Sequence, residues 1–522
     1  MGADVIVVGA GPVGLMLAGE LRLGGADVVV YDKLPAPTGE SRALGFNRRV
    51  AESLDQRGLL TRIGGFRWGP QGHFGGVRID LGMLDETHNG VLGLPQAAIE
   101  ETLAGWLADL GVQVRRGYEA VGMRQDADGV LVTLDGPGGR REEAGAYLAG
   151  CDGGQSIIRR LAGIEAHGWE STRGMYTAEI TGIEMPPRPI GERLPGGNMV
   201  VCTNLGDDRY RIVIQARSLP PHPDPEALTF AEVADAWQRL TGDSIHHARP
   251  LWMWACGNSA RLATGYRRGR VFLAGDAAHD TPPLAAWGLS AGILDAVNLG
   301  WKLAAAVTGW GDEALLDSYS GERHPIGERL MRDIRAASML YLGGDEMEPL
   351  RDVLRELVAW KDAAGFLAGE VSGLGIRYEV GAGEHPLLGK RMPPERRLVL
   401  AGQAATRVAD LLNPARGVFV TTEAASENAR LASGWADRVD VVAGHWDEAG
   451  PAEAGPAEAG PAEALIRPDG YVAWTAPGGG DLATALARWF GAPRAAEPLA
   501  AEPRAAEPLA GLQPAASQPV AS

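Results

Sequence analysis

Residues 270–293 read RVFLAGDAAHDTPPLAAWGLSAGI, and the rest of the chain can be organised around this stretch. The apolar run at its start predicts a buried strand, a sharp turn follows at Gly275 and Asp276, and a helix is predicted from about Ser290. An acid at the end of a strand can accept sugar hydroxyls, and the free N–H groups of a helix start attract anions. The stretch therefore favours a sugar-phosphate ligand, although a capped corner in a core would look the same.

A second strand-to-helix junction lies at the start of the chain. The apolar run 4–8 predicts a strand buried on both faces of a parallel sheet, and GAGPVG at 9–14 follows directly. A helix comes next, and then a second strand at 27–31 that ends at Asp32. Strand, G-x-G-x-x-G turn, helix, strand and acid in this order form the dinucleotide-binding fingerprint. An acid at position 32 favours FAD or NAD over NADP, because it suits free ribose hydroxyls.

Each glycine of this turn has its own expected role. Gly9 allows the tight turn, Gly11 lets the backbone approach a pyrophosphate, and Gly14 lets helix and strand pack closely. Asp32 is expected to accept hydrogen bonds from the adenosine ribose. A third junction, AGCDGGQS at 149–156, again combines an acid with glycines before a predicted helix. Three such junctions in one chain make a purely structural explanation of each one weaker.

Two side chains outside the junctions are further candidates. Arg42 lies in the loop 38–44, close to the expected pyrophosphate, but a solvated surface arginine is an equally good explanation. A helix is predicted from Leu94 onward, and its apolar residues at 99–110 belong to the core rather than to a site. Gln96 lies in the first turn of that helix and is therefore its candidate ligand contact.

The middle of the chain changes character at about residue 172. Alternating stretches between 172 and 262 predict a mostly antiparallel sheet, interrupted by one helix at 231–240. Such an inserted sheet typically covers a ligand. Its aromatic residues, which include Trp252 and Trp254, are more readily explained as core than as site.

Composition bounds the classes of partner and compartment. The chain has 522 residues, 45% of them hydrophobic, and a formal net charge of −17, which argues against nucleic acid or an anionic membrane as main partner. No apolar run is long enough for a transmembrane span, and the start lacks a signal-peptide pattern. The three cysteines have no metal-type spacing. We expect a cytoplasmic protein without a metal site or disulfides.

The motifs GAGPVG, CDG at 151–153 and GDAAH at 275–279 occur in the order typical of single-component FAD-dependent aromatic hydroxylases. The chain resembles this family, the p-hydroxybenzoate hydroxylase class. Segments such as TGESRALGF, QGHFGG and HPLLGKRMP are most similar to the angucycline-type aromatic polyketide hydroxylases of antibiotic pathways. The resemblance covers about residues 2–493.

The resemblance implies an α/β fold with an FAD-binding Rossmann-like domain, an inserted antiparallel-sheet substrate domain and a C-terminal thioredoxin-like domain. That last domain contains no cysteine, so thiol–disulfide chemistry is excluded. The FAD-binding domain is expected at 1–171 and 263–390, the substrate domain at 172–262 and the thioredoxin-like domain at 391–493. The Ala/Glu/Pro-rich tail at 494–522 is predicted to be disordered.

The implied activity is that of a monooxygenase. FAD is the expected cofactor, NADPH the transient electron donor, and a C4a-hydroperoxyflavin formed with O2 would hydroxylate a polycyclic aromatic polyketide. Asp152 matches a motif associated with both FAD and nicotinamide binding. A monomer or homodimer is expected. The implied cofactor-binding residues are Gly9, Gly11, Pro12, Val13, Gly14, Asp32, Lys33, Arg42, Gln96, Asp152, Asp276, Pro283, Gly288, Leu289 and Ser290.

One segment departs from the family pattern. Residues 285–290 read AAWGLS where the family has GGQGLN or GGQGMN. The alanines and Trp287 could displace the flavin or shape the substrate pocket, and neutral drift of the loop explains the departure equally well. The chemistry is expected to be centred on the flavin, with Trp287 as the candidate catalytic residue. Two alternatives therefore stay open: Baeyer–Villiger or ring-opening oxygenation on the same fold, and a redox-silent ligand-binding or dehydrating pathway protein.

Overall fold

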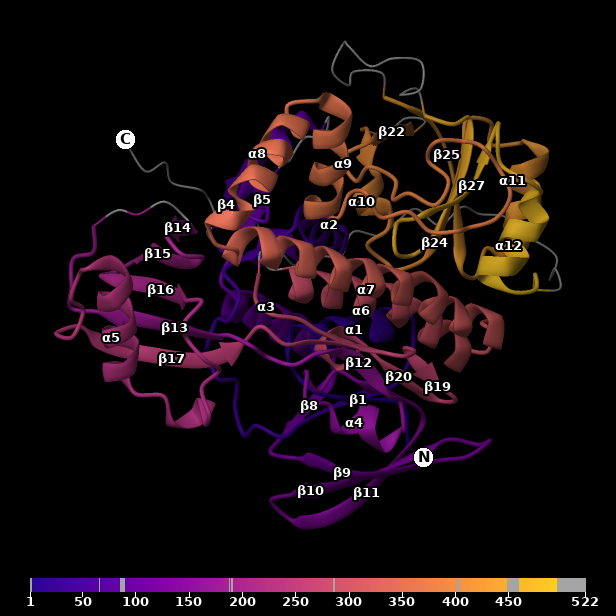
Figure 1. Ribbon diagram of the computed structural model, residues 1–522. Helices are drawn as coiled ribbons and strands as arrows, with labels where there is room; N and C mark the ends of the chain where they lie inside the picture. The colour runs from indigo at the N-terminus through magenta and orange to yellow at the C-terminus, as the bar shows by residue number, and fades with distance from the viewer. Residues whose placement is uncertain are drawn as a thin grey trace.

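The computed structural model describes residues 2–64, 66–84, 90–186, 188, 191–284, 287–400, 404–447 and 460–494. Sheets surround two long central helices, α6 (Trp287–Val307) and α7 (Glu313–Leu342), which cross the middle of the molecule in Figure 1. Helix α6 begins at Trp287 rather than near Ser290. Ala285 and Ala286 of the departing segment, and the tail from residue 495, lie outside the described residues.

The N-terminal sheet has the strand order β19-β20-β11-β1-β2-β8, and β10 and β9 extend it from β11. Its strands are β1 (Ala3–Val8), β2 (Val28–Asp32), β8 (Gln113–Arg116), β9 (Glu119–Gln125), β10 (Val130–Gly136), β11 (Gly139–Gly150), β19 (Arg267–Arg268) and β20 (Val271–Leu273). Strand β1 pairs in parallel with β2 and β11, and β11 pairs in parallel with β20. Val5, Ile6 and Val7 are fully buried, as expected for a strand covered on both faces.

Helix α1 (Pro12–Leu23) packs against both α6 and α3 (Gln96–Asp109). The close contact with α3 requires a glycine, because a Cβ at Gly19 would lie 2.0 Å from the ring of Trp106. Shorter helices and strands complete this half of the molecule. They are α2 (Arg48–Gln56), α4 (Ile157–Leu161), β3 (Gly45–Phe46), β4 (Arg67–Gly69), β5 (Gln71–Phe74), β6 (Val77–Asp80), β7 (Val91–Gly93), β12 (Ala166–Trp169), β18 (Ala260–Ala263) and β21 (His279–Asp280).

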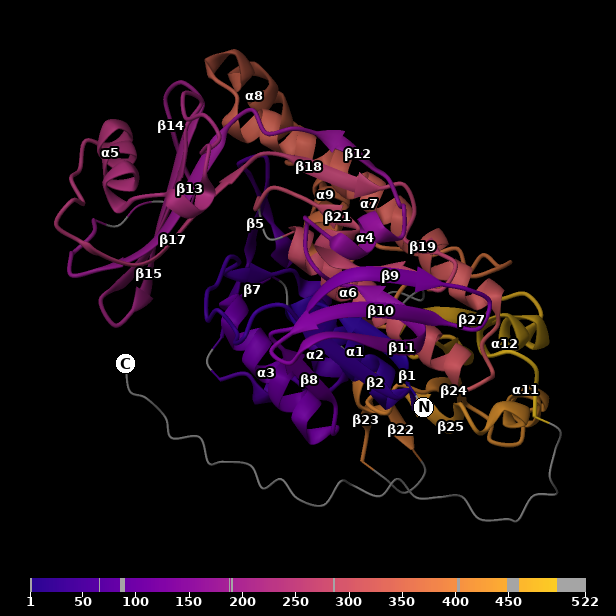
Figure 2. The same ribbon diagram turned by 90° about the horizontal axis from the view of Figure 1, so that it is seen from below.

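The inserted region is the antiparallel sheet that the alternating pattern predicted. Its order is β14-β15-β16-β13-β17, and its strands are β13 (Gly174–Thr181), β14 (Glu192–Leu194), β15 (Asn198–Gly206), β16 (Arg209–Gln215) and β17 (Arg249–Gly257). Helix α5 (Phe230–Thr241) covers one face of this sheet and buries Trp237 there. We call this sheet the substrate sheet, after the role expected for residues 172–262. Figure 2 shows it at the opposite end of the molecule from the C-terminal region.

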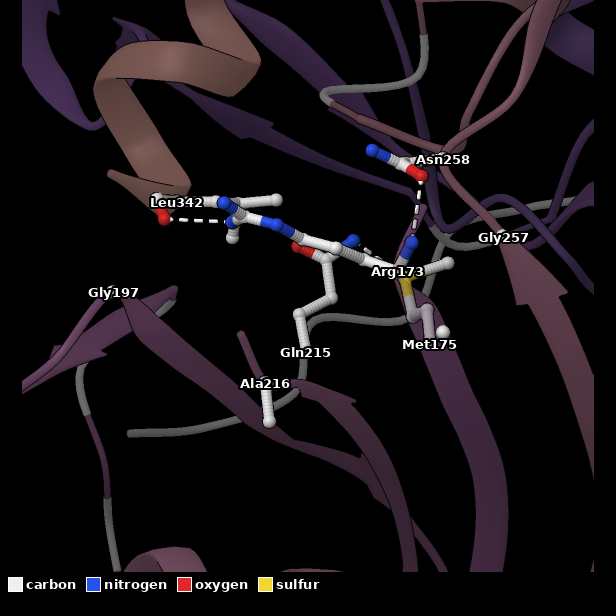
Figure 3. A pocket seen from close by; sticks show the side chains of 9 residues that line it. Arg173, Met175, Gly197, Gln215, Ala216, Gly257, Asn258 and Leu342 are labelled. Atoms are coloured by element: carbon white, nitrogen blue, oxygen red, sulfur yellow. Dashed lines mark hydrogen bonds between the residues drawn. The ribbon is translucent and has the colours of Figure 1, made fainter. Parts of the chain in front are cut away.

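The chain enters and leaves the substrate sheet at one neck, formed by residues 171–173 and 257–258. Asn258 Oδ1 accepts the backbone N–H groups of Thr172 (2.8 Å) and Arg173 (3.0 Å), and the Asn258 N–H donates to Ser171 Oγ (3.0 Å). Arg173 donates to the carbonyl oxygen of Leu342 at the end of α7 (2.8 Å), as Figure 3 shows. These contacts attach the neck to the central helices.

The C-terminal region is a small α/β module with the sheet order β23-β22-β25-β24-β26-β27. Its elements are β22 (Arg397–Leu400), β23 (Thr406–Arg407), α10 (Val408–Leu411), β24 (Gly417–Thr421), α11 (Glu427–Ala432), β25 (Val439–Trp446), β26 (Glu463–Ile466), β27 (Val472–Ala476) and α12 (Leu482–Phe490). Along the chain, helices α8 (Glu348–Leu357) and α9 (Lys361–Ser372) follow α7 and precede this module, and both pack against β6.

A buried ion cluster joins the central helices to the C-terminal module. Glu322 of α7 accepts hydrogen bonds from Asn298 and Lys302 of α6, both at 2.7 Å, and from Arg467 Nη1 at 2.5 Å. Arg467 also pairs with Asp469. Burial would raise the pKa of Glu322, but the charges of Arg467 and Lys302 outweigh it and lower that pKa to about 2. This ion cluster is thus ionised and internally paired.

Candidate functional site

The three strand-to-helix junctions lie side by side at one edge of the N-terminal sheet. Val8 of β1 lies opposite Gly150 of β11, and Gly150 lies opposite Leu273 of β20. The next residues continue the ladder, since Cys151 N donates to Val8 O (2.8 Å) and Ala274 N donates to Gly150 O (3.0 Å). Open α/β sheets bind ligands beyond the carboxyl ends of their parallel strands. The motifs therefore come together where this architecture places a ligand.

The glycine turn is closely packed on the protein side and open on the other. Gly9 has a φ of 107°, and a Cβ there would lie 2.2 Å from the carbonyl oxygen of Cys151. A Cβ at Gly14 would lie 1.9 Å from Gly9 O, whereas a Cβ at Gly11 would meet no protein atom within 4 Å. Gly11 is also the N-cap of α1, with no side chain capping the helix and Pro12 following it. The open side therefore leaves helix N–H groups available to an anion, and their contact with a pyrophosphate stays a prediction.

Asp32 faces this turn from the end of β2. Its Oδ2 accepts the Ala10 N–H (2.7 Å), its Oδ1 accepts the Leu34 N–H (2.8 Å), and Arg116 lies 3.7 Å away. Each carboxylate oxygen retains a further lone pair, so the fixed carboxylate can still accept ribose hydroxyls. Lys33 beside it is exposed.

Asp276 is the acid of the site that has room for a ligand. Its side chain is exposed, yet the surrounding protein raises its pKa by burial, while His279 and Arg42 act in the opposite direction. Within the described residues it makes no ion pair or hydrogen bond, so both oxygens are free to accept ribityl hydroxyls. Gly275 keeps it close to α1, because a Cβ there would lie 2.9 Å from the Val13 side chain.

A buried acid that sequence reasoning did not identify supports the Gly-Asp turn. Asp295 of α6 accepts the Gly275 N–H (3.1 Å) and the Arg323 Nε–H (2.7 Å), and it lies 2.5 Å from His279 Nε2. Burial would raise the pKa of Asp295, but His279 and Arg323 outweigh it and lower that pKa. The ionised carboxylate fixes the turn that carries Asp276. The position of Asp295 within a predicted helix gave no signal of this role.

The start of α6 combines close packing with one unsatisfied donor. Ser290 Oγ accepts the Asn47 N–H (3.2 Å), and a Cβ at Gly288 would lie 2.3 Å from Thr281 Oγ1. Trp287 is 9% exposed and its ring lies 5.8 Å from that of Phe74. Within the described chain its buried Nε1 has no hydrogen-bond partner. Trp287 therefore contributes to an apolar wall beside the expected flavin loop. Of its neighbours, Pro283 is exposed and Leu289 is half-buried.

The remaining predicted residues differ in how free they are. Both oxygens of Asp152 are engaged at the start of α4, where Oδ1 accepts Ser156 Oγ–H (2.5 Å) and Oδ2 accepts the Ile157 N–H (2.7 Å). The half-buried carboxylate is thus occupied by hydrogen bonds at the start of α4, and its contact with FAD or nicotinamide stays a prediction. Gln96 donates to Glu100 (2.8 Å) in the first turn of α3. Arg42 forms no ion pair or hydrogen bond within the described residues.

These groups suit FAD as the ligand. An open glycine turn and helix start suit its pyrophosphate, Asp32 suits its ribose, and Asp276 suits its ribityl chain. Across the described ranges, no cluster of three or more His, Cys, Asp or Glu side chains could hold a metal ion. In the same ranges no helix has the length and apolarity needed to cross a membrane.

Comparison with known proteins points to the same cofactor. The family model of the FAD binding domain matches residues 2–333, and that of the aromatic-ring hydroxylase C-terminal region matches residues 385–493. The structure of CabE, an aromatic hydroxylase from angucycline biosynthesis, is 48% identical, has a TM-score of 0.90, and covers 95% of this chain and 100% of its own.

Curated relatives span nearly the whole chain. The 12-dehydrotetracycline 5-monooxygenase/anhydrotetracycline 6-monooxygenase of Streptomyces rimosus subsp. rimosus is 39% identical over 94% of this chain and 99% of its own. The dialkyldecalin synthase of Streptomyces rugosporus is 35% identical over 94% of this chain and 99% of its own. The resemblance read from the three motifs is confirmed. This chain therefore belongs to the FAD-dependent aromatic-ring hydroxylases and is an enzyme of the monooxygenase class.

Proposed function

We propose that this monooxygenase takes electrons from NADPH and hydroxylates a polycyclic aromatic polyketide of the angucycline type. The observation that supports FAD binding is the alignment of the three junctions, with Gly11 open and Asp276 unpaired. The similarity to CabE, at 48% identity, supports the substrate half.

The protein's own part is to bind and position its ligands. FAD supplies the redox and oxygen chemistry when bound, so no acid–base pair of the chain is required for oxygen transfer. The α1 start and Arg42 bind the pyrophosphate, Asp32 the ribose, and Asp276 the ribityl chain. Asp295 holds the Gly275–Asp276 turn in place. The apolar wall that contains Trp287 and Phe74 would limit the access of water to the flavin ring.

The test is an anaerobic reduction of the purified holoenzyme, followed through the flavin absorbance. We expect NADPH to bleach the flavin faster than NADH does, and an angucycline-type aromatic ligand to accelerate the bleaching. Subsequent exposure to air should yield a product one oxygen atom heavier. Protein that carries no flavin, or flavin that NADPH leaves oxidised with and without ligand, contradicts the proposal.

The products separate the alternatives. A hydroxylated ring identified by mass and NMR supports hydroxylation, whereas a lactone or an opened ring indicates Baeyer–Villiger or ring-opening oxygenation. One relative is named a dialkyldecalin synthase rather than a monooxygenase, so NADPH consumption should be measured together with the product. Conversion of the ligand without NADPH consumption would indicate a redox-silent role and overturn the proposal.

A further inference from the structure

Arg42, the predicted pyrophosphate contact, reaches the substrate sheet. Its guanidinium carbon lies 4.9 Å from the centre of the Trp254 ring on β17. We propose that Trp254 positions Arg42 for the FAD pyrophosphate, so that the substrate sheet forms part of the cofactor site. This inference rests on the assignment of Arg42 to the pyrophosphate within the proposed function.

The face of β17 that carries Trp254 is turned away from α5. Met253 and Ala255 pack into the apolar cluster beneath α5. Because successive side chains of a strand point to opposite faces, Trp252, Trp254 and Cys256 lie on the other face. That face lies close to the N-terminal half of the molecule, since the pKa of Cys256, raised mainly by burial, also responds to the charge of Arg42. Trp254 is therefore available to Arg42 without disturbing the α5 cluster.

The guanidinium of Arg42 lies among groups of the cofactor site. Its charge acts to lower the pKa of Asp276, which burial raises, and it does the same for Glu100, the partner of Gln96. Yet it forms no ion pair or hydrogen bond in the part of the chain that the structure describes. An aromatic ring covers a face of the planar guanidinium and leaves the N–H groups at its edge free. Those N–H groups are the ones that recognise a phosphate.

The contact should act by pre-organisation. Arg42 is exposed, and an exposed arginine loses rotamer freedom when it binds an anion. A ring that already holds the guanidinium lowers that loss, so Trp254 should strengthen FAD binding without touching FAD. Because coupling between two sites is reciprocal, a ligand that shifts the substrate sheet should also change FAD affinity.

The experiment titrates apoprotein with FAD and measures the Kd from flavin fluorescence. Trp254→Leu should raise the Kd about 2- to 5-fold, the range of an exposed cation–π contact, and Trp254→Phe should recover part of the affinity. Trp252→Leu is the matched control, because Trp252 lies two residues away on the same face and covers Arg211 instead. It should leave the Kd unchanged.

A double-mutant cycle separates positioning from a general structural effect. Arg42→Ala should weaken FAD binding, and adding Trp254→Leu to Arg42→Ala should have no further effect. The inference is overturned if Trp254→Leu behaves like Trp252→Leu, or if its effect persists in the Arg42→Ala background. Unchanged FAD affinity in Arg42→Ala itself would overturn the pyrophosphate assignment along with the inference. None of these outcomes depends on the substrate or on NADPH, so the proposed hydroxylation is tested independently.

Discussion

Charged side chains near the two ends of helix α6 differ in how completely they are paired. Near its start, Asp276 and Arg42 form no ion pair or hydrogen bond within the described residues, and Gly11 faces open space. Toward its end, Lys302 is buried and pairs with Glu322 of α7, which also accepts hydrogen bonds from Asn298 and Arg467. The charges that hold the C-terminal module in place are paired, whereas Asp276 and Arg42 at the sheet edge are left for a ligand. Pairing, rather than burial alone, distinguishes structure from site in this molecule.

The paired end should be the more sensitive to the loss of one member. Arg467→Met leaves Glu322 and Asp469 buried without their main partner, and we expect the free energy of unfolding to fall by about 3–5 kcal/mol. Urea unfolding measures the change. Arg140→Met is the control, because Arg140 forms an exposed pair with Asp135 on the surface and its loss should cost far less. Equal losses in the two variants would contradict the comparison.

Acid should weaken the same ion cluster and so lower the free energy of unfolding. Glu322 has a folded pKa of about 2 against an ordinary value of 4.5, so its contribution is complete above pH 4.5 and is lost as the pH falls toward 2. The expected loss is roughly 3 kcal/mol. Stability measured against pH should therefore be steeper for the wild-type protein than for Glu322→Gln over this interval. Parallel curves would show that Glu322 does not titrate as expected.

At the open end, two glycines of one turn should respond differently to alanine. Gly11→Ala places a methyl group in the space kept for the pyrophosphate, so FAD affinity should fall about tenfold, or 1.4 kcal/mol. The stability of the apoprotein should change by less than about 1 kcal/mol, since no protein atom is near. Gly14→Ala should lower both the FAD affinity and the stability of the apoprotein, because its Cβ would clash with Gly9 O. A Gly11→Ala protein that binds FAD normally would refute the open-turn assignment.

The smallest effect is expected at Asp276. Burial raises the pKa of this carboxyl, so its ionised form destabilises the apoprotein above that pKa and not below it. Asp276→Asn should therefore stabilise the apoprotein slightly at pH 8, and the gain should shrink toward acid pH. FAD affinity should fall several-fold at the same time. Thermal unfolding with and without FAD measures both, and a variant that is less stable without FAD would indicate an unseen structural partner.

The sequence was sufficient where the information is local. A fingerprint turn is encoded in six consecutive residues, and alternation over a few residues predicted the antiparallel sheet. It was insufficient for the register that aligns Val8, Gly150 and Leu273, because that alignment depends on pairing between distant segments. The ion cluster around Glu322 is hidden for the same reason.

Individual side chains show the same limit. Asp152 was selected from its motif, and only the folded chain shows that its carboxylate caps α4. Asp295 carries no motif, yet it holds the Gly275–Asp276 turn. Trp254 was expected to be core, whereas it is half-buried with Arg42 over its ring. For Asp295 and Trp254 the deciding neighbour is remote in the chain, whereas Asp152 is engaged by Ser156 and Ile157, which follow it closely.

The neck at residues 171–173 and 257–258 has a consequence for exchanging parts between relatives. The chain enters and leaves the substrate sheet at adjacent points, and hydrogen bonds between Ser171 and Asn258 join these two points. Segments whose ends lie close together can be transplanted with little disturbance of the host. Residues 174–257 should thus be replaceable as one cassette from a related hydroxylase, and FAD binding should be retained best where the incoming sheet keeps an aromatic residue at position 254 beside Arg42.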